Sequence, residues 1–356
     1  MTNENNKIII MDTHMHSKAS DGVWTPRELV QNAKLKGLEI IALTDHDTTF
    51  GVAEALAAGK EYGVEVIPGI EIDAYYNSKT GKVKNIELLG LGVDLAKIQP
   101  LVDKRNSDRL ALLGDYINGF NAYMGSEKFM KENEQKQFKF NAQKQTNLAE
   151  VINWYNARNL DEQGVAYQNP NPFLSKMTLI QFIADTLLEE DKKALILKGD
   201  RAAGEAFKNE YRGILFTERE SKPSFYEAIA AVKAAGGKAI VAHPGLSKGY
   251  ENGMLKEWES PEAEWFVEAE RFTPYLFIKD LKAHGLDGIE LYNYQGSDKA
   301  HAENQNKIND YFAKLANKLE LMVTYGSDCH GPKGSGVQLG KFGSNYSYLN
   351  QIVGGN

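Results

Sequence analysis

The sequence predicts an α/β fold, a barrel of about seven strand–helix units with an inserted, mostly helical unit. Short apolar runs alternate with amphipathic segments over most of the chain, which is typical of α/β proteins rather than of separate α and β blocks. One long stretch, residues 97–222, contains no clear strand. Five of the seven histidines directly follow apolar runs, as polar side chains do at one end of a barrel.

Seven apolar runs are expected to form the strands of the barrel. They lie at residues 7–13, 38–44, 64–72, 85–93, 238–242, 287–292 and 320–326. The first expected helix opens at Thr25, its N-cap, with Pro26 in the first turn, and Gly37 ends it. The other helices around the barrel are expected over residues 52–62, 224–235 and 297–318.

The stretch between the fourth and fifth strands is expected to be a separate helical unit. The predicted domains are therefore a barrel of residues 1–96 plus 223–356 and an insertion of residues 97–222 that shapes the substrate pocket. The first helix of the insertion is expected over residues 97–120. Its middle, residues 125–147, is rich in Lys, Glu, Gln and Asn and is predicted to be a solvated helix or a mobile segment.

Two further segments are expected to be loops or small insertions. The sequence Asn169-Pro170-Asn171-Pro172 marks a loop. A second, smaller insertion is expected over residues 248–273, where Trp258 and Trp265 form either its small core, which we favour, or a lid that stacks on a base.

Composition excludes several classes of protein. A chain of 356 residues that is 42% hydrophobic can bury a large core, enough for one barrel and an appended unit. The net charge of −7, without a basic run, argues against stable binding to long nucleic acid. No stretch reaches the roughly 18 apolar residues of a membrane helix. The single cysteine, Cys329, fits a reducing compartment, so a cytoplasmic location is expected. The oligomeric state stays open.

The histidines and nearby carboxylates predict a metal site. His14 and His16, two residues apart on an extended segment, point the same way. The other donors that follow apolar runs or lie close to them are Asp21, His46, Glu71, His243, Asp328 and His330. Mixed nitrogen and oxygen donors suit zinc, manganese or iron. Since one ion needs fewer donors, we expect two or three ions.

Such a centre is suited to phosphoester hydrolysis. Two ions roughly 3.5–4 Å apart can hold a hydroxide between them and neutralise charge on a phosphoryl group during in-line attack. The expected reaction is therefore attack of this bridging hydroxide on a terminal phosphate monoester, without a phosphoenzyme intermediate.

Six motifs follow one another along the chain in this order: Asp12-Thr13-His14-Met15-His16, Ala19-Ser20-Asp21-Gly22, Leu43-Thr44-Asp45-His46-Asp47-Thr48, Pro68-Gly69-Ile70-Glu71-Ile72, Ala242-His243-Pro244 and Gly326-Ser327-Asp328-Cys329-His330. They resemble the motifs of the PHP (polymerase and histidinol phosphatase) metal-dependent phosphoesterases. Residues 17–71 most resemble the branch of nucleoside 3′,5′-bisphosphate and 5′-nucleotide phosphatases that also trims short RNA from the 5′ end. The resemblance covers about residues 1–95 and 235–335.

The resemblance implies a distorted seven-stranded, TIM-like barrel with a trinuclear centre of manganese, zinc or iron, with magnesium as an alternative. It implies one ion held by His14, His16, Glu71 and Asp328, a second by Asp21, His46 and His330, and a third by Glu71 and His243. Many relatives offer a histidine from the fourth strand to the third ion, whereas this chain presents Glu87. His243 and Asp328 are the expected catalytic residues, and either His243 or a metal-bound water protonates the leaving oxygen.

The substrate is expected to be a small phosphorylated molecule, and residues of the insertion are expected to contact it. Arg105 and Arg109 resemble the arginine-bearing segment that follows the fourth strand in the family, and a guanidinium fork is suited to a second phosphate. They could equally be solvated helix charges. The sequence leaves a mononucleotide, a nucleoside bisphosphate and an oligonucleotide open as substrates.

Several single residues have competing interpretations. Asp45 and Asp47 either orient His46, which we slightly favour, or form the turn. Glu290 faces the site or solvent with equal weight. Three more residues are expected outside the chemistry: Cys329 as structural filler, His284 at a helix end on the surface, and His301 in a polar helix that is more often clear of the substrate than in contact with it.

Three other functions stay open at this stage. A histidinol phosphate phosphatase is disfavoured by the long insertion. A metal-dependent amidohydrolase also begins its barrel with a His-x-His pair, but it usually ends with a lone aspartate where this chain has Asp328-Cys329-His330. A metal-binding accessory module without turnover is disfavoured because all six motifs carry their ligands.

Overall fold

The computed structural model describes residues 11–77, 82–83, 86–198, 200–216, 222–246, 273–292, 294, 299–332 and 339. These residues form two compact units. The first contains residues 1–102 and 222–356, and the second contains residues 103–221. Among the described residues, no helix combines the length and the apolar character that crossing a membrane would require.

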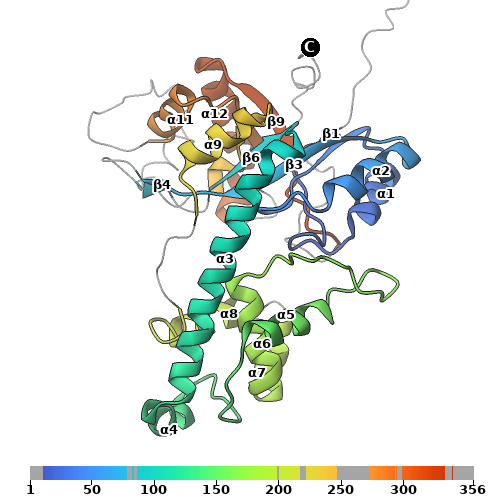
Figure 1. The fold of residues 1–356 in the computed structure, drawn as a ribbon. Coiled ribbons are helices and arrows are strands. Elements are labelled where there is room, and N and C mark those ends of the chain that lie inside the picture. Colours follow the sequence, from blue (N-terminus) through green and yellow to red (C-terminus); the bar gives the residue numbers. More distant parts are fainter. Residues whose placement is uncertain are drawn as a thin grey trace, which may run out of the picture. The chain divides into compact units, whose positions relative to one another are not determined.

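The first unit is built on a seven-stranded sheet that is nearly closed into a barrel (Figure 1). In sheet order the strands are β1 (Met11–Asp12), β2 (Ile40–Leu43), β3 (Glu65–Asp73), β6 (Glu87–Leu91), β7 (Lys238–Val241), β8 (Gly288–Tyr292) and β9 (Met322–Gly326). The first and last strands meet through a hydrogen bond from the Thr13 amide to the Tyr325 carbonyl, 2.9 Å long. The predicted seven-stranded α/β barrel is confirmed.

One strand departs from the regular strand–helix repeat. β6 runs antiparallel to both of its neighbours, β3 and β7, whereas the other neighbouring strands of the sheet are parallel. The described residues of the connection from β3 to β6 include no helix; they form a small antiparallel pair, β4 (Tyr76–Asn77) and β5 (Lys82–Val83). A parallel neighbour is usually reached through a crossover helix, whereas here the chain turns back through this pair and β6 runs antiparallel to β3.

The helices of the first unit begin and end close to the predicted residues. They are α1 (Pro26–Leu35), α2 (Val52–Tyr62), α9 (Phe225–Ala234), α11 (Pro274–Ala283) and α12 (Lys299–Lys318). Thr25 caps α1 in a capping box with Glu28, and Gly63 ends α2 in the left-handed conformation at φ 67°. The end of α11 at His284 agrees with the helix end expected there, whereas the start of this helix was not predicted.

Apolar side chains fill the inside of the barrel below the site. The buried members of this cluster are Ala42, Leu89, Leu91, Ile240 and Ala242. Larger clusters of buried apolar side chains pack the surrounding helices against the outside of the sheet. The barrel is therefore a packed core rather than a pore, and the polar side chains of the predicted site gather where the strands end.

The second unit is helical and has an apolar core of its own. Its helices are α3 (Leu95–Met124, which begins in the first unit), α4 (Glu127–Glu132), the 3₁₀ turn η1 (Asn133–Gln135), α5 (Leu148–Asn156), α6 (Lys176–Leu187), α7 (Glu190–Leu197) and α8 (Arg201–Glu210). The segment Asn169-Pro170-Asn171-Pro172 is a loop, as predicted.

The prediction of a solvated or mobile segment over residues 125–147 is wrong. Phe129, Phe138 and Phe140 from this segment are buried in the core of the second unit. The Asn133 amide group bonds to the backbone NH and carbonyl of Phe140, both at 2.8 Å, and closes the loop between them. Three aromatic rings outweigh the polar composition because each buries a large apolar area.

The second predicted insertion, residues 248–273, lies outside the described residues except for Thr273, the N-cap of α11. Trp258 and Trp265 belong to the part that is not described.

Candidate metal centre

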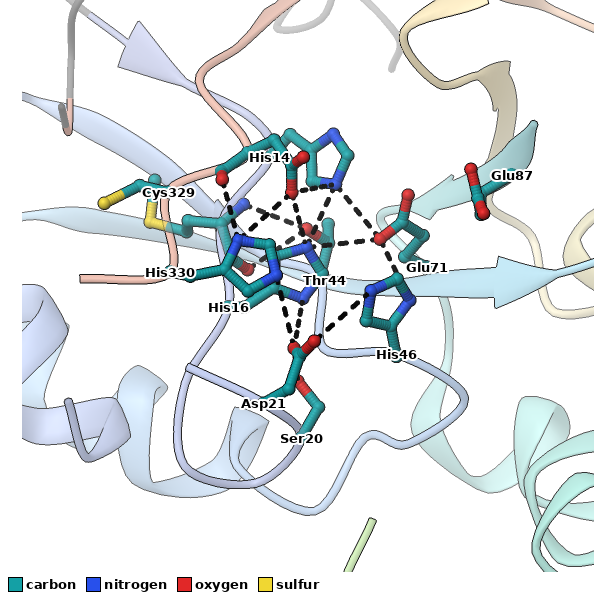
Figure 2. A network of polar contacts seen from close by, with 12 residues as sticks. His14, His16, Ser20, Asp21, Thr44, His46, Glu71, Glu87, Cys329 and His330 are labelled. Carbon is teal, nitrogen blue, oxygen red and sulfur yellow. Dashed lines mark hydrogen bonds and ion pairs between the residues drawn. The ribbon is translucent and has the colours of Figure 1, made fainter. Parts of the chain in front are cut away.

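The polar side chains predicted from the six motifs gather at one end of the barrel (Figure 2). Two isolated parallel bridges extend the pairing beyond the regular strands: Met15 pairs with Cys329, and His46 pairs with Glu71. Each bridge sets residues from distant parts of the sequence side by side. Since alternate residues of an extended segment point to opposite faces, Met15 and Cys329 enter the apolar core while their neighbours point into the site.

A first group of possible ligands consists of His14, His16, Glu71 and Asp328. The Nε2 atoms of His14 and His16 each lie 3.2 Å from Glu71 Oε2. The same two nitrogens lie 3.4 Å and 3.0 Å from Asp328 Oδ1. The side chains of His14, His16 and Glu71 are fully buried. Two imidazole nitrogens and two carboxylate oxygens thus face one point.

A second group consists of His16, Asp21, His46 and His330. His330 Nε2 lies 3.3 Å from Asp21 Oδ1, and His46 Nε2 lies 3.9 Å from Asp21 Oδ2. His16 stacks against both other imidazoles, with ring centroids 4.5 Å from His46 and 4.2 Å from His330. The second nitrogen of His16, Nδ1, lies 3.8 Å from Asp21 Oδ1, so His16 borders two groups. The sequence analysis assigns it to the first alone.

A third group consists of Glu71, Glu87 and His243. His243 Nε2 lies 3.3 Å from Glu71 Oε1 and 3.6 Å from Glu87 Oε2. Glu87 is the first residue of β6, and the antiparallel direction of that strand brings its beginning to the same end of the barrel as the ends of its neighbours. The carboxylate of Glu71 therefore borders all three groups.

The residues fit divalent metal ions. Glu71 Oε2, His16 Nδ1 and His243 Nδ1 are buried and have no hydrogen-bond partner. Burying such atoms without a partner costs free energy, so native proteins rarely do so. Glu71 Oε2 lies 3.2 Å from nitrogens of His14, His16 and His46, and none of these contacts has hydrogen-bond geometry. Convergence of lone pairs without hydrogen bonds is typical of metal ligands, and the mixed nitrogen and oxygen donors suit zinc, manganese or iron.

The protonation of the metal-free site reflects the same crowding. Burial lowers the pKa of the imidazoles, but the surrounding carboxylates outweigh it and raise the pKa of His46 to about 10 and those of His243 and His330 to about 9. Burial alone would raise the pKa of the Glu71 carboxyl, yet the imidazoles of His14 and His46 hold it well below its usual range. Burial raises the pKa of Glu87 to about 7.

These shifts predict that metal binding is pH-dependent. At pH 7 the imidazoles of His46, His243 and His330 carry protons in the metal-free protein, and an ion must displace them. Affinity for Mn²⁺ should therefore rise with pH between 6.5 and 8.5, by about tenfold per pH unit for each proton displaced. Competition with a chelating dye at fixed ionic strength measures this slope. An affinity that does not change over this range would contradict the assignment of these imidazoles as ligands.

The supporting contacts differ in part from the sequence interpretation. Asp45 accepts hydrogen bonds from the amide and hydroxyl of Ser17 at 2.7 Å and from the Ser20 hydroxyl at 2.5 Å, so it orders the loop that carries Asp21. The slight preference for Asp45 as the acceptor that orients His46 is therefore not supported. Asp47, at φ 52°, accepts from the Asp73 amide at 3.3 Å and fits the turn interpretation.

Glu290 is the residue whose role the sequence leaves undecided. It is fully buried and faces the site, where its carboxylate contacts His14 and His243. All five residues of β8 are buried, and Glu290 is the single carboxylate among them. A lone carboxylate in an apolar run is the sequence signal that points to this role.

The remaining candidates lie outside these groups. Cys329 is buried, and burial raises the pKa of its thiol to about 11, which fits structural filler. His284 is exposed at the C-cap of α11, as predicted. Arg105 and Arg109 lie on α3 in the second unit; Arg105 is buried, and the Arg109 guanidinium lies 4.5 Å from the Phe173 ring centroid. The side chain of His301 lies outside the described part of the structure.

Comparisons with known proteins agree with this geometry. Residues 12–186 match the family model for the PHP domain. A 5′-3′ exoribonuclease from Haemophilus influenzae is 28% identical over 338 residues, which cover 93% of this chain and 93% of the relative. A 3′,5′-nucleoside bisphosphate phosphatase from Chromobacterium violaceum is 38% identical over 87 residues, which cover 24% of this chain and 29% of the relative.

Solved structures share the fold. A structure described as an amidohydrolase from Chromobacterium violaceum, with bound sulfate and no metal, superposes with a TM-score of 0.57 at 23% identity. It covers 92% of this chain, and 89% of that chain is matched. This likeness shows the fold alone. The PHP domain match and the curated relatives identify the chain as a member of the PHP family of metal-dependent phosphoesterases.

Proposed function

We propose that this protein removes a terminal phosphate monoester from a nucleotide, which is a 5′-nucleotide, a nucleoside 3′,5′-bisphosphate or a short 5′-phosphorylated RNA. The observation that carries this proposal is the position of Glu71, which belongs to the first and the third ligand groups and whose Oε2 lies 3.2 Å from Nδ1 of His46 in the second. Groups that share a carboxylate would hold their ions close together. Such neighbouring ions, when bound, would activate water and neutralise the charge of a transferring phosphoryl group.

The ligand assignment is part of the proposal. We assign His14, His16, Glu71 and Asp328 to one ion, Asp21, His46 and His330 to a second, and Glu71, Glu87 and His243 to a third. Manganese, zinc and iron fit the first two sets, and a set with two carboxylates also accommodates magnesium.

His243 has two mutually exclusive roles in this proposal. Its raised pKa, about 9, means that it is protonated at neutral pH when the third ion is absent. It can then hold the proton that the leaving oxygen takes up. When the third ion is bound, Nε2 is a ligand and the proton must come from water. Asp328 contacts both His14 and His16 and would hold these imidazoles in place.

A lysine beside the third group favours an anionic substrate. Lys222 Nζ lies 3.3 Å from Asp73 Oδ2, and the other oxygen of that carboxylate lies 3.8 Å from His46 Nδ1. Although burial disfavours its charge, Asp73 and Glu87 raise the pKa of Lys222, so it stays cationic. We propose that Lys222 contacts the substrate from the first unit. Arg105 and Arg109, on the predicted pocket-shaping insertion 97–222, stay our proposal for a second phosphate.

Replacing Lys222 by methionine should raise KM for a nucleotide about tenfold or more and leave kcat nearly unchanged. The reason is that the lost contact would stabilise the bound substrate and the transition state equally. Lys222→Arg, which keeps the charge, should stay within a few-fold of the wild type. Initial rates over a range of substrate concentrations separate the two parameters. A Lys222→Met enzyme with an unchanged KM would exclude Lys222 from substrate binding.

The substrate proposal is tested with a panel of phosphate esters. Manganese-loaded protein is incubated with adenosine 3′,5′-bisphosphate, 5′-AMP, a short 5′-phosphorylated RNA and histidinol phosphate, beside Asp328→Asn as the inactive control. Release of phosphate or mononucleotide from the nucleotides alone supports the proposal. Faster release from histidinol phosphate would move the protein to another branch of the family, and release from none, with metal bound, would overturn the nucleotide assignment.

A phosphodiester belongs in the same panel. A phosphoribosyl 1,2-cyclic phosphate 1,2-diphosphodiesterase from Eggerthella lenta is 42% identical over 86 residues, covering 32% of that relative. A five-membered cyclic phosphate of ribose therefore serves as the diester arm. The monoester proposal expects slower turnover of this compound than of the nucleotides.

A further inference from the structure

One buried carboxylate contacts two of the three ligand groups. Glu290, in the middle of β8, is fully excluded from solvent. Its Oε1 lies 2.9 Å from Nδ1 of His14, which belongs to the first group. Its Oε2 accepts a hydrogen bond of 2.7 Å from the backbone amide of His243, which belongs to the third group. Both oxygens are therefore used, each on a different group.

The contact with His14 decides which ring nitrogen can bind an ion. A carboxylate is an acceptor, so Nδ1 of His14 must be the donor and carry a hydrogen. In the neutral ring this leaves the lone pair on Nε2, the nitrogen that lies 3.2 Å from Glu71 Oε2 and 3.2 Å from His16 Nε2. A ligating histidine that donates its other N–H to a carboxylate is fixed in tautomer and orientation and is a more basic ligand.

The contact with His243 holds a strained backbone. His243 has φ of 24°, outside the regions that non-glycine residues ordinarily occupy, and Pro244 follows it. Such a conformation is destabilising and persists only when the surroundings enforce it. The hydrogen bond from the His243 amide to Glu290 Oε2 is one such restraint, and it directs the imidazole toward Glu71 and Glu87.

The opposite strand makes room for this carboxylate. Gly326, the last residue of β9, lies against Glu290, and a Cβ atom there would overlap both Glu290 Oε1 and the Cβ of His14. Glycine at this position therefore allows the close approach of Glu290 to His14. The position of the carboxylate can thus be disturbed without changing the carboxylate itself.

We propose that Glu290 is a positioning residue that couples two ion sites, so that the ion of the His14 group and the ion of the His243 group bind cooperatively. An ion bound by either histidine, His14 or His243, holds that residue in place and thereby fixes the Glu290 carboxylate. The fixed carboxylate in turn orders the other histidine, so the coupling is reciprocal. Glu290 has no contact with Asp21 or His330 among the interactions found for the described residues, so loss of its carboxylate should leave the ion of that group bound as before. The inference rests on the ligand assignment of the proposed function and not on the substrate.

The test compares metal binding by three variants with the wild type. Glu290→Gln keeps the shape of the side chain but has a single acceptor oxygen, so one of the two donors loses its partner. Gly326→Ala displaces Glu290 without altering it, and it also presses on His14 directly, so its informative effect is on the ion of the His243 group. Asn309→Leu is the matched control: Asn309 is buried and bonds to the amide and carbonyl of Tyr292, at the end of the same strand, without contacting a ligand.

Metal-free protein is titrated with Mn²⁺ by calorimetry, and bound manganese is counted by elemental analysis after gel filtration. We expect two ions to bind the wild type cooperatively, and Glu290→Gln and Gly326→Ala to weaken those two by about 10–100-fold, the cost typical of losing a partner of a metal ligand. The remaining ion should bind as in the wild type. Asn309→Leu should lower Tm and leave the isotherm unchanged.

The coupling is overturned if Glu290→Gln binds all ions as the wild type does, weakens a single ion, or weakens all ions equally. Should Glu290→Gln fail to fold, the effect of Gly326→Ala on the ion of the His243 group decides, because Gly326 lies against His14 as well as Glu290. Because the readout is bound metal, a protein that binds ions cooperatively but hydrolyses no nucleotide would contradict the proposed function and leave the coupling intact.

Discussion

Replacing Glu71 by glutamine should reduce phosphate release from a nucleotide by more than about 100-fold, because losing even a residue that only supports a metal ligand typically costs 10–100-fold. Glu71 is fully buried, and its two oxygens contact histidines of all three groups: His14, His16, His46 and His243. Glutamine has the same shape but a neutral head with one oxygen. It would remove the anion that the first and third proposed ions share.

The matched control for this variant lies on the same strand. Glu65, at the other end of β3, is exposed, and Glu65→Gln should be indistinguishable from the wild type in activity and metal content. Steady-state rates are measured at saturating Mn²⁺, with circular dichroism to verify folding. A Glu71→Gln enzyme that retains more than about a tenth of the wild-type rate would show that the shared carboxylate does not organise the ions.

Removing the ions with a chelator should abolish activity and lower Tm, and both should return with Mn²⁺. A ligand that binds only the folded state stabilises it by about 4 kcal/mol when present at 1,000 times its Kd. In the metal-free site, buried carboxylates such as Glu71 and Asp328 depend on protonated imidazoles alone for compensation of their charge. The loss should therefore appear in the melting of the first unit, which contains every proposed ligand.

Differential scanning calorimetry with and without chelator measures this change, and the dependence of Tm on free Mn²⁺ gives the affinity. Glu71→Gln is the appropriate comparison, because a variant that has lost its ions should respond much less to the chelator. An unchanged Tm together with undiminished phosphate release after exhaustive chelation would contradict a metal-dependent reaction.

Much of the barrel was predictable because its signals are local. Apolar runs bounded by glycines and by capping residues such as Thr25 mark strands and helices within a few residues. The convergence of the candidate ligands was predictable for a related reason: parallel strands end at the same side of a sheet, so polar residues that follow them must meet. His14, His46 and Asp328 come together in this way although they are far apart in the sequence.

The parts that could not be predicted depend on tertiary structure. The direction of β6 depends on how the chain turns back after β3, and the apolar run at residues 85–93 is compatible with either direction. The burial of Phe129, Phe138 and Phe140 could not be predicted from composition, because residues 125–147 are polar on average and three aromatic rings change that average little. The strand that carries Glu290 is buried on both faces. Its sequence therefore lacks the apolar–polar alternation that would have indicated whether Glu290 faces the site.

Anomalous diffraction at the manganese edge, from crystals grown with Mn²⁺, tests the central claim most directly, because it locates the ions without reference to turnover. The account predicts peaks at the end of the barrel bounded by His14, Glu71 and His330, with Glu71 contacting more than one of them. An absence of peaks at this end at millimolar Mn²⁺, or peaks confined to the surface, would contradict the assignment of these strand-end residues as a metal centre.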